Sequence, residues 1–552
     1  MGGKRGTVMS ARRGGKPFPH PGVVFAGPLP KCFVYILASF ILQWAYGLGA
    51  NVVQSNIVYL TGDFHATLTE TTWLVAAYMA PNVSVAIMLI KIRYQFGLRA
   101  FAELSILGFV LVCVLQLFVT DLRSALIIRF FAGIAAAPLA SLALLYMMEA
   151  FAPAKKFTIG LSLNYMNATL AAPLSRLISP DLLENGGFLS LSAMEMGLVL
   201  LSLGCIYALP LTPIVRNKVI EKLDWVSYGL IAFGLGINAV IMSVGILYWW
   251  YEAPWIGWVG ALAIFSLMIA TMIELNRKNP LIDLRWLLSK EMVQTVFILL
   301  VFHVFLLERS TLAANFFNLF GLLNREMVPM YLAIVLGALS GGAVCVFFLR
   351  IGREDYFYLF SLGFLALGTY LDSHVNHLTR PQDMMWSQGL ISFSYALFLP
   401  PVLCKGFVTS GARGPRYVLS FIAVFLLTQV TGGLVGSALF GSLQVFFAHK
   451  NFESLTQNIL VTDPLISGEA NTLFSPSYGA SSHLLGSEQG TAMLVNKFKL
   501  TANIFAYDDV FRLYFYIATV TFVIFLVKIL VQLCSWRLRM KQDSVIKEEC
   551  KK

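Results

Sequence analysis

Apolar runs of about 18 or more residues recur along nearly the whole chain, and no other feature limits its fold as strongly. Such a run crosses the hydrocarbon core of a bilayer as an α-helix, whose backbone polar groups bond within the helix. The pattern predicts an all-α polytopic membrane protein. We expect fourteen transmembrane helices, near residues 32–57, 72–90, 99–119, 124–148, 157–178, 189–212, 223–247, 255–273, 292–316, 328–349, 355–371, 384–404, 417–447 and 513–535.

The distribution of charge predicts the orientation. Most of the 40 Lys and Arg residues fall in the two tails and in alternate loops, such as Lys91–Arg99 and Arg277–Lys290. Cytoplasmic loops collect Lys and Arg during insertion, so both termini are predicted to be cytoplasmic. The same rule accounts for the net charge of +11, and no nucleic-acid-binding motif accompanies it. We therefore expect a lipid bilayer around the chain and no nucleic-acid partner.

Three segments lie outside the predicted spans. Residues 1–31 are a predicted flexible cytoplasmic tail without the apolar core of a signal peptide, and residues 536–552 form a second tail. Residues 448–511 form a predicted external loop. Its ends are either short amphipathic helices lying against the protein or the membrane surface, or helical stubs of a solvated loop. No cysteine falls in an external loop, so a disulfide framework is not expected.

Three charged residues inside predicted spans need a cavity or a partner. Arg129 lies in the apolar stretch "IIRFFAGIAAAPLAS", whose small residues let neighbouring helices approach closely, so Arg129 is predicted to point inward. Arg176 and Glu195 lie at a similar depth, and Glu195 is a candidate partner for either arginine. The group either couples or gates a transport process, or it is an ion pair that only fixes helix packing.

The span near 292–316 contains His303, Glu308 and Arg309. A partly buried Glu is suited to carry a proton, so Glu308 is a second candidate beside Glu195. Alternatively, Glu308 and Arg309 lie at the external interface, where Arg309 reaches water. His303 lies deeper, and it either lines a cavity or is a hydrogen-bonded packing residue.

Polar side chains within other spans are further candidates for a cavity lining. Asn51 and Gln54 lie near the outer end of the first span, and Asn164 and Asn167 form a polar stripe one turn apart in the fifth. Gln429 is the corresponding candidate in the thirteenth span. The amides of the first span either line a pathway or cap the helix.

The sequence shows no motif of an enzyme or of an ATP-driven pump. A Walker A lysine motif, an HExxH motif and a nucleophile elbow are all missing from it. His374 and His377, after Asp372, have the spacing of metal ligands on a helix, but they lie in a short predicted external loop with no further obvious ligand. We therefore expect no catalytic residue, no cofactor and no metal.

Several stretches together resemble the major facilitator superfamily, in its fourteen-span EmrB/QacA-type branch of drug:proton antiporters. "IIRFFAGIAAAPLASLALLYMMEAFAPAKKF" is similar to the branch's fourth-span motif, with Arg129 four residues before Gly133. The first-to-second-span passage, the opening "LDWVSYGL", the stretch "NPLIDLRWLLSK" and the ending "ANIFAYDDVFRLYF" are also similar. The resemblance covers about residues 32–535.

The resemblance implies a major facilitator fold. An N-terminal six-helix half at 32–212 and a C-terminal half at 291–535 would enclose a central cavity, with two inserted helices and a linker at 213–290. It implies alternating access and proton-coupled export of small amphipathic or aromatic compounds, as in multidrug efflux, from the inner membrane of a bacterial cell. Protons and a small-molecule substrate are then partners, and a periplasmic adaptor with an outer-membrane channel is a further one.

The chain departs from the branch at three places. Tyr46 stands where the branch often has an acidic residue in the first span, so Tyr46 joins the cavity-lining candidates. The loop "LIKIRYQFGLRA" lacks the usual Asp, and Arg176 with Pro180 stands in the neighbourhood of the fifth-span antiporter motif. The alternatives are a transporter of the same fold that imports or is not proton-coupled, and a membrane sensor or assembly subunit that transports nothing.

Overall fold

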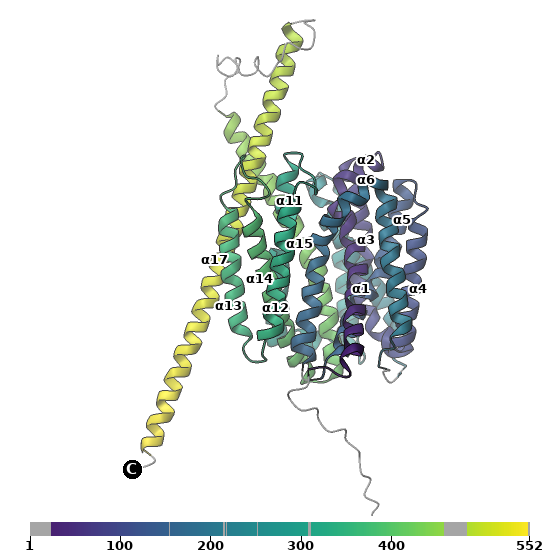
Figure 1. Ribbon diagram of the computed structural model, residues 1–552, viewed down its shortest axis with the longest axis vertical. Helices are drawn as coiled ribbons and strands as arrows, with labels where there is room; N and C mark the ends of the chain where they lie inside the picture. Colours follow the sequence, from purple (N-terminus) through teal and green to yellow (C-terminus); the bar gives the residue numbers. More distant parts are fainter. Residues whose placement is uncertain are drawn as a thin grey trace, which may run out of the picture.

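Long helices that run side by side across one bundle make up the fold (Figure 1). The computed structural model describes residues 24–549, except 154, 213–215, 217, 251, 307–310 and 458–482. The helices before the linker are α1 (Leu29–Ser55), α2 (Ile57–Asp63), α3 (Leu68–Phe96), α4 (Leu98–Gln116), α5 (Leu122–Ala150), η1 (Lys156–Gly160), α6 (Leu161–Ala208), α7 (Lys222–Val244), η2 (Gly245–Tyr248) and α8 (Pro254–Asn276).

The remaining helices follow a short connection after α8. They are α9 (Leu284–Leu287), α10 (Lys290–Leu306), α11 (Thr311–Asn318), α12 (Val328–Phe348), α13 (Glu354–Asp372), α14 (Met385–Gly411), α15 (Pro415–Thr456) and α17 (His483–Glu549). The helices α1–α6 are called the N-terminal half below, and α10–α17 the C-terminal half.

Eleven helices in the described part of the chain are long and apolar enough to cross a membrane. One of them, α6, covers both the fifth and the sixth predicted spans, while α13 is not among the eleven. The ninth predicted span corresponds to the shorter helices α10 and α11, with residues 307–310 between them outside the described part. The chain is therefore an all-helical polytopic membrane protein, and the number fourteen stays a prediction.

The break within α6 is set by one glycine and one aspartate. Gly187 has a φ of 56°, in the left-handed region that favours glycine. A Cβ there would lie 2.7 Å from both carboxylate oxygens of Asp63. The Asp63 carboxylate instead accepts a hydrogen bond from the backbone N–H of Phe188 at 2.7 Å, which caps the second segment of α6. The second segment of α6, which corresponds to the sixth predicted span, therefore begins beside Asp63, the last residue of α2.

The helix ends follow ordinary capping chemistry. Thr67 caps the start of α3 with a capping box. In it, the Glu70 carboxylate accepts from the Thr67 backbone N–H at 2.8 Å, and the Glu70 backbone N–H donates to the Thr67 hydroxyl at 3.2 Å.

At the other end of the bundle, Phe25 pairs with Phe151 in an isolated antiparallel bridge. The last residues of the predicted N-terminal tail are therefore held against the chain that follows α5.

Pairs of helices join the two halves directly. In the N-terminal half, α1 packs on α5 and α6, and in the C-terminal half α14 packs on α12 and α13. Across the middle, α6 packs on α12 and α14, and α3 packs on α15. The helix α7 lies against α3, α8 and α15, so the inserted pair contacts both halves.

The predicted external loop at 448–511 is largely helical where it is described. The helix α15 continues to Thr456, and α17 begins at His483 and runs unbroken through the fourteenth predicted span to Glu549. Both extend beyond the bundle on the side where α2 lies (Figure 1). Asn451 donates to Asp509 at 2.9 Å, which ties the two together. The two ends of this region are therefore helical, and each helix is continuous with the neighbouring predicted span.

Candidate functional site

A cavity of about 660 Å³ lies between the two halves. Its rim is formed by α2 and by residues 323–326, whose exposed members include Tyr59 and Leu323, so the cavity opens at the end of the bundle where α2 lies (Figure 1). Its walls come from α1, α3, α6, α7, α11 and α15. They include Gln43, Tyr46, Asn51, Gln54, Ala168, Arg176, Met242, Ser243, Thr311, Asn315, Asn318, Gln429 and Ser437.

A smaller recess of about 140 Å³ continues the cavity toward the middle of the bundle. The recess shares seven residues with the main cavity, which are Asn51, Gln54, Ser55, Ala168, Arg176, Thr311 and Gln429. Its remaining walls are tyrosine, threonine and aliphatic side chains, from Tyr165, Thr169, Ala172, Tyr395 and Leu399. Polar groups therefore converge from both halves on one small volume, as they do in sites for small molecules.

A hydrogen-bonded group around Asn324 ties the halves together beside the cavity. Asn324, between α11 and α12, donates to the Ser55 carbonyl at 3.0 Å and to Asn56 Oδ1 at 2.9 Å, both from the N-terminal half. Its own Oδ1 accepts from Arg176 Nη1 at 3.3 Å and from the Tyr331 hydroxyl at 3.1 Å. Because every polar atom of its amide is used, Asn324 is fixed in orientation.

An ion pair joins the halves at the cavity rim. Arg325 donates to the carboxylate of Glu184 on α6, and both side chains are more than half exposed. The hydrogen bond raises the pKa of Arg325 above its usual value. Exposed pairs of this kind add little to stability, so this pair is easily opened.

Apolar packing closes the end of the bundle opposite the rim. The ring of Phe157 in η1 stacks on Phe407 of α14 with centroids 5.5 Å apart, and Tyr165 packs edge-on against Phe425 at 5.2 Å. A Cβ on Gly342 of α12 would lie 2.3 Å from the Met166 side chain, so α6 and α12 touch. The cavity is thus open at one end and sealed by interlocked side chains at the other.

Arg129 and Glu195 lie inside the N-terminal half, away from the cavity lining. Arg129 is 1% exposed, its Nη1 donates to the Gly49 carbonyl at 3.1 Å, and its guanidinium carbon lies 4.4 Å from the centre of the Tyr78 ring. Glu195 accepts from Gln116 at 3.1 Å through Oε2, while Oε1 has no partner among the described residues. No ion pair joins the two side chains there. Both nevertheless contact Gly49 of α1.

Three predicted lining residues are placed elsewhere by the structure. Asn164 and Asn167 are buried in helix packing, where Asn167 donates to the Phe40 carbonyl at 3.5 Å. His303 is fully buried, its Nδ1 bonds to the Leu299 carbonyl at 2.7 Å, and it packs against Gly432. The position of these residues along the predicted spans indicated their depth in the membrane. It did not indicate whether their side chains face the cavity or a neighbouring helix. Glu308 lies outside the described residues.

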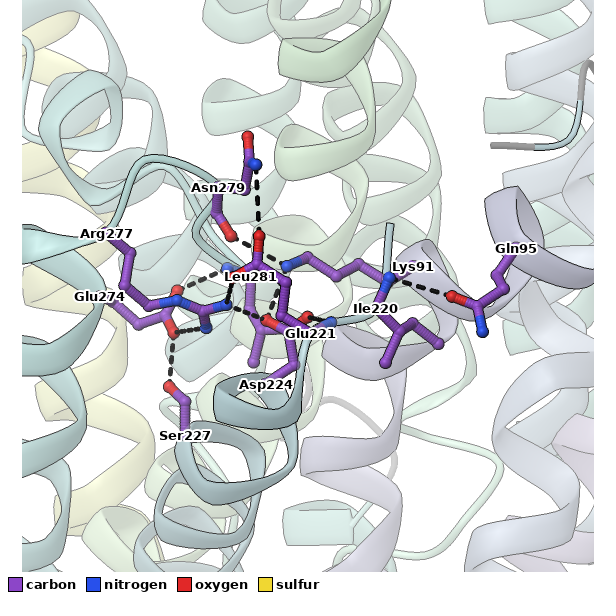
Figure 2. A network of polar contacts seen from close by, with 10 residues as sticks. All are labelled: Lys91, Gln95, Ile220, Glu221, Asp224, Ser227, Glu274, Arg277, Asn279 and Leu281. Carbon is purple, nitrogen blue, oxygen red and sulfur yellow. Dashed lines mark hydrogen bonds and ion pairs between the residues drawn. The ribbon is translucent and has the colours of Figure 1, made fainter. Parts of the chain in front are cut away.

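A buried cluster of charges connects α3 with the inserted helices (Figure 2). Lys91 of α3 and Arg277 after α8 both contact Asp224 Oδ1 of α7, at 2.6 and 2.7 Å. Arg277 also contacts Glu274 at 3.2 Å and Glu221 at 3.0 Å, and its hydrogen bond lowers the pKa of Glu221. The sequence analysis treated Lys91 and Arg277 only as loop charges. The signal for this cluster in the sequence is that residues of opposite charge lie at the ends of these predicted spans.

No protein-family model matches the sequence, and no curated protein matches it. Solved structures do share its fold. A structure of a proton-dependent oligopeptide transporter has a TM-score of 0.55 at 14% identity and covers 90% of this chain and 98% of its own. The proton:xylose symporter XylE bound to 6-bromo-6-deoxy-D-glucose has a TM-score of 0.51 at 11% identity and covers 88% and 95%. The human organic anion transporter MFSD10 (TETRAN) has 0.51 at 11%, and covers 89% and 100%.

These likenesses define the class of the fold. The chain is a polytopic membrane protein with the major facilitator superfamily fold. At 11–14% identity the likeness extends to the fold and assigns no branch of the superfamily.

Proposed function

We propose that this chain is a proton-coupled secondary transporter of small molecules that works by alternating access. The observation that carries the proposal is the 660 Å³ cavity between the halves, open at the α2 end and closed by Phe157, Phe407 and their neighbours at the other. This is the form expected of one of two states in which a central site faces each side of the membrane in turn. If the basic loops are cytoplasmic, the cavity faces the outside.

The coupling group in this proposal is Glu195 with Arg129. A carboxylate that is 5% exposed and holds one oxygen without a partner is poised to gain or lose a proton. Its neighbour Gly49 lies in α1 between Gly47 and Asn51, both of which line the cavity. A change of charge on Glu195 would therefore act on the helix that carries the cavity wall. A proton drives transport only when it binds the two states unequally.

Export of amphipathic or aromatic compounds, as in the EmrB/QacA-type branch, is the direction and cargo we propose. The apolar and amide walls of the cavity support this cargo. The name of the XylE structure, which describes that protein as a proton symporter, supports coupling to protons but not the direction. The α15–α17 extension offers a surface for an adaptor protein on the outer side (Figure 1). Uptake, or transport without protons, is the alternative with the same fold.

Proteoliposomes test the proposal with two aromatic dyes as probes, the cation ethidium and the anion fluorescein. An imposed pH gradient is expected to drive accumulation of at least one dye by the wild-type protein. Glu195→Gln is expected to abolish gradient-driven accumulation while keeping counterflow of the same dye, because the cavity remains intact. Glu103→Gln, on the exposed side of α4, serves as the matched control and is expected to behave as wild type. Accumulation that persists in Glu195→Gln would refute the coupling role, and failure of counterflow with both dyes would refute transport of aromatic compounds.

A further inference from the structure

One charged side chain stands out within the recess of the proposed transport cavity. Arg176 is the sole charged residue among the described residues that line the recess, and it is 6% exposed. The other charged groups around the cavity, Glu184, Arg325 and Glu326, lie at the rim. Glu184 and Arg325 neutralise each other there, and Glu326 accepts the Leu323 backbone N–H at 2.9 Å. The inner part of the cavity therefore carries a positive charge.

The neighbours of Arg176 leave one edge of its guanidinium free. Its Nη1 bonds to Asn324 at 3.3 Å and to the Tyr331 hydroxyl at 3.4 Å. Its Nε and Nη2 make no hydrogen bond to any residue that the structure describes, yet neither is sealed from the cavity. In an arginine, Nε–H and one Nη2–H point the same way and together match the two oxygens of a carboxylate.

The free edge is also held in place. Asn324 is fixed by Ser55 and Asn56, and the guanidinium carbon lies 5.7 Å from the centre of the Tyr331 ring. A donor pair fixed by its surroundings loses little entropy when it binds an acceptor. Arg176 shares the recess with the side-chain amides of Gln54 and Gln429. Such amides supply further donors for an anion, while the apolar walls suit the rest of a molecule.

We propose, resting on the proposed transport function, that the cargo is an organic anion: a carboxylic acid with an apolar or aromatic body. The carboxylate binds the Nε–Nη2 edge of Arg176, and the body lies in the wider cavity toward α7 and α15. Binding supplies Arg176 with its missing counter-charge. Because Arg176 is bonded to Asn324 and Tyr331 of the C-terminal half, the carboxylate binds where the halves meet.

Binding of three probes to the purified protein tests this inference without measuring transport. Cinnamate, cinnamamide and cinnamylamine differ only in the polar group, and their dissociation constants are measured by titration calorimetry at neutral pH. Wild type is expected to bind cinnamate at least about tenfold more tightly than the other two, since hydrogen bonds to charged groups contribute that much. Equal or reversed affinity among the three, or no binding of cinnamate, would overturn the inference.

Variants of Arg176 assign the preference to its free edge. Arg176→Gln is expected to remove the preference for cinnamate and keep the affinity for cinnamamide. Arg176→Lys is expected to keep part of the preference, because it retains the charge but not the paired donors. Arg99→Gln, a cation paired with Glu103 on α4 and outside the cavity lining, is expected to keep the whole preference. Equal loss of affinity for all three probes in both Arg176 variants would mean a structural role and overturn the inference. These results do not depend on whether either dye is transported.

Discussion

Glu195 occupies the space that a side chain on Gly49 would need. A Cβ built at Gly49 would lie 2.4 Å from Glu195 Oε1 and 3.1 Å from its carboxyl carbon. The Gly49 carbonyl also accepts the hydrogen bond from Arg129 at 3.1 Å. One glycine of α1 therefore fixes how closely the buried carboxylate and guanidinium approach this helix.

Gly49→Ala is expected to destabilise the protein by about 1–3 kcal/mol, because Glu195 or α1 must move to admit the methyl group. The melting temperature of the detergent-purified protein measures the effect. Gly62→Ala in α2 is the control, since a Cβ there meets nothing within 4 Å. Equal melting temperatures for the two variants would contradict the close approach of α1 and α6.

Asp224→Asn is expected to cost about 3–5 kcal/mol, because it leaves the buried cations Lys91 and Arg277 without their shared carboxylate. Thermal unfolding in detergent measures the loss. The control is Glu103→Gln, which breaks a surface pair with Arg99 and is expected to change stability by less than about 1 kcal/mol. A similar shift in both variants would show that the buried cluster does not join α3 to the inserted helices.

Asn324→Ala is expected to widen the mouth of the cavity, because Asn324 bonds Ser55 and Asn56 across the halves. Labelling of a cysteine placed at Gln54 with a membrane-impermeant maleimide reports the change. The rate is expected to rise about fivefold, as the loss of roughly 1 kcal/mol of hydrogen bonding implies. Asn318→Ala, at another cavity-lining amide, is expected to leave the rate unchanged. An unchanged rate in Asn324→Ala would rule out its role in holding the mouth.

Cross-linking the rim is expected to stop transport reversibly. Glu184 and Arg325 form an ion pair between the halves, so cysteines at both positions come within reach of a short bis-methanethiosulfonate, which joins two thiols through disulfides and releases sulfinate. In a chain whose seven native cysteines are replaced, the cross-link is expected to block dye counterflow, and a thiol reductant, which cleaves the disulfides, is expected to restore it. The single variant Glu184→Cys treated alike is the control. Counterflow that continues through the cross-linked protein would contradict alternating access.

The sequence predicted the fold class because insertion into lipid leaves the backbone few choices. Apolar runs had to become helices, and all-helical polytopic architecture with the major facilitator fold is confirmed. The sequence predicted two spans where α6 lies, with a gap at 179–188, and α6 does break at Gly186 and Gly187. The contact that holds this break could not be predicted, because it joins Gly187 to Asp63, over a hundred residues away. Helices were expected at the ends of the external segment, but their continuity with the neighbouring spans through 448–456 and 483–511 was not, because polar composition lowers hydropathy without ending a helix.

The site was harder to predict than the fold. Tyr46, Asn51, Gln54, Arg176 and Gln429 lie on the cavity, whereas Asn164, Asn167 and His303 lie in helix packing. All are polar residues in apolar helices, and nothing local distinguishes a side chain that faces a cavity from one that faces a neighbouring helix. Asn324 was missed altogether, because a polar residue in a short connection carries no signal of contact with a distant helix.

The uninterrupted course of α17 has a mechanical consequence. At 1.5 Å per residue, a 67-residue helix is about 100 Å long, roughly three times the thickness of the hydrocarbon core of a membrane. This single helix is therefore long enough to reach the water on both sides of the membrane. The helix α17 packs on α13 and α15 near its middle. A tilt of about 10° would therefore move its two ends in opposite directions by close to 9 Å each. A rocking motion of the bundle would thus displace any molecule bound to either end.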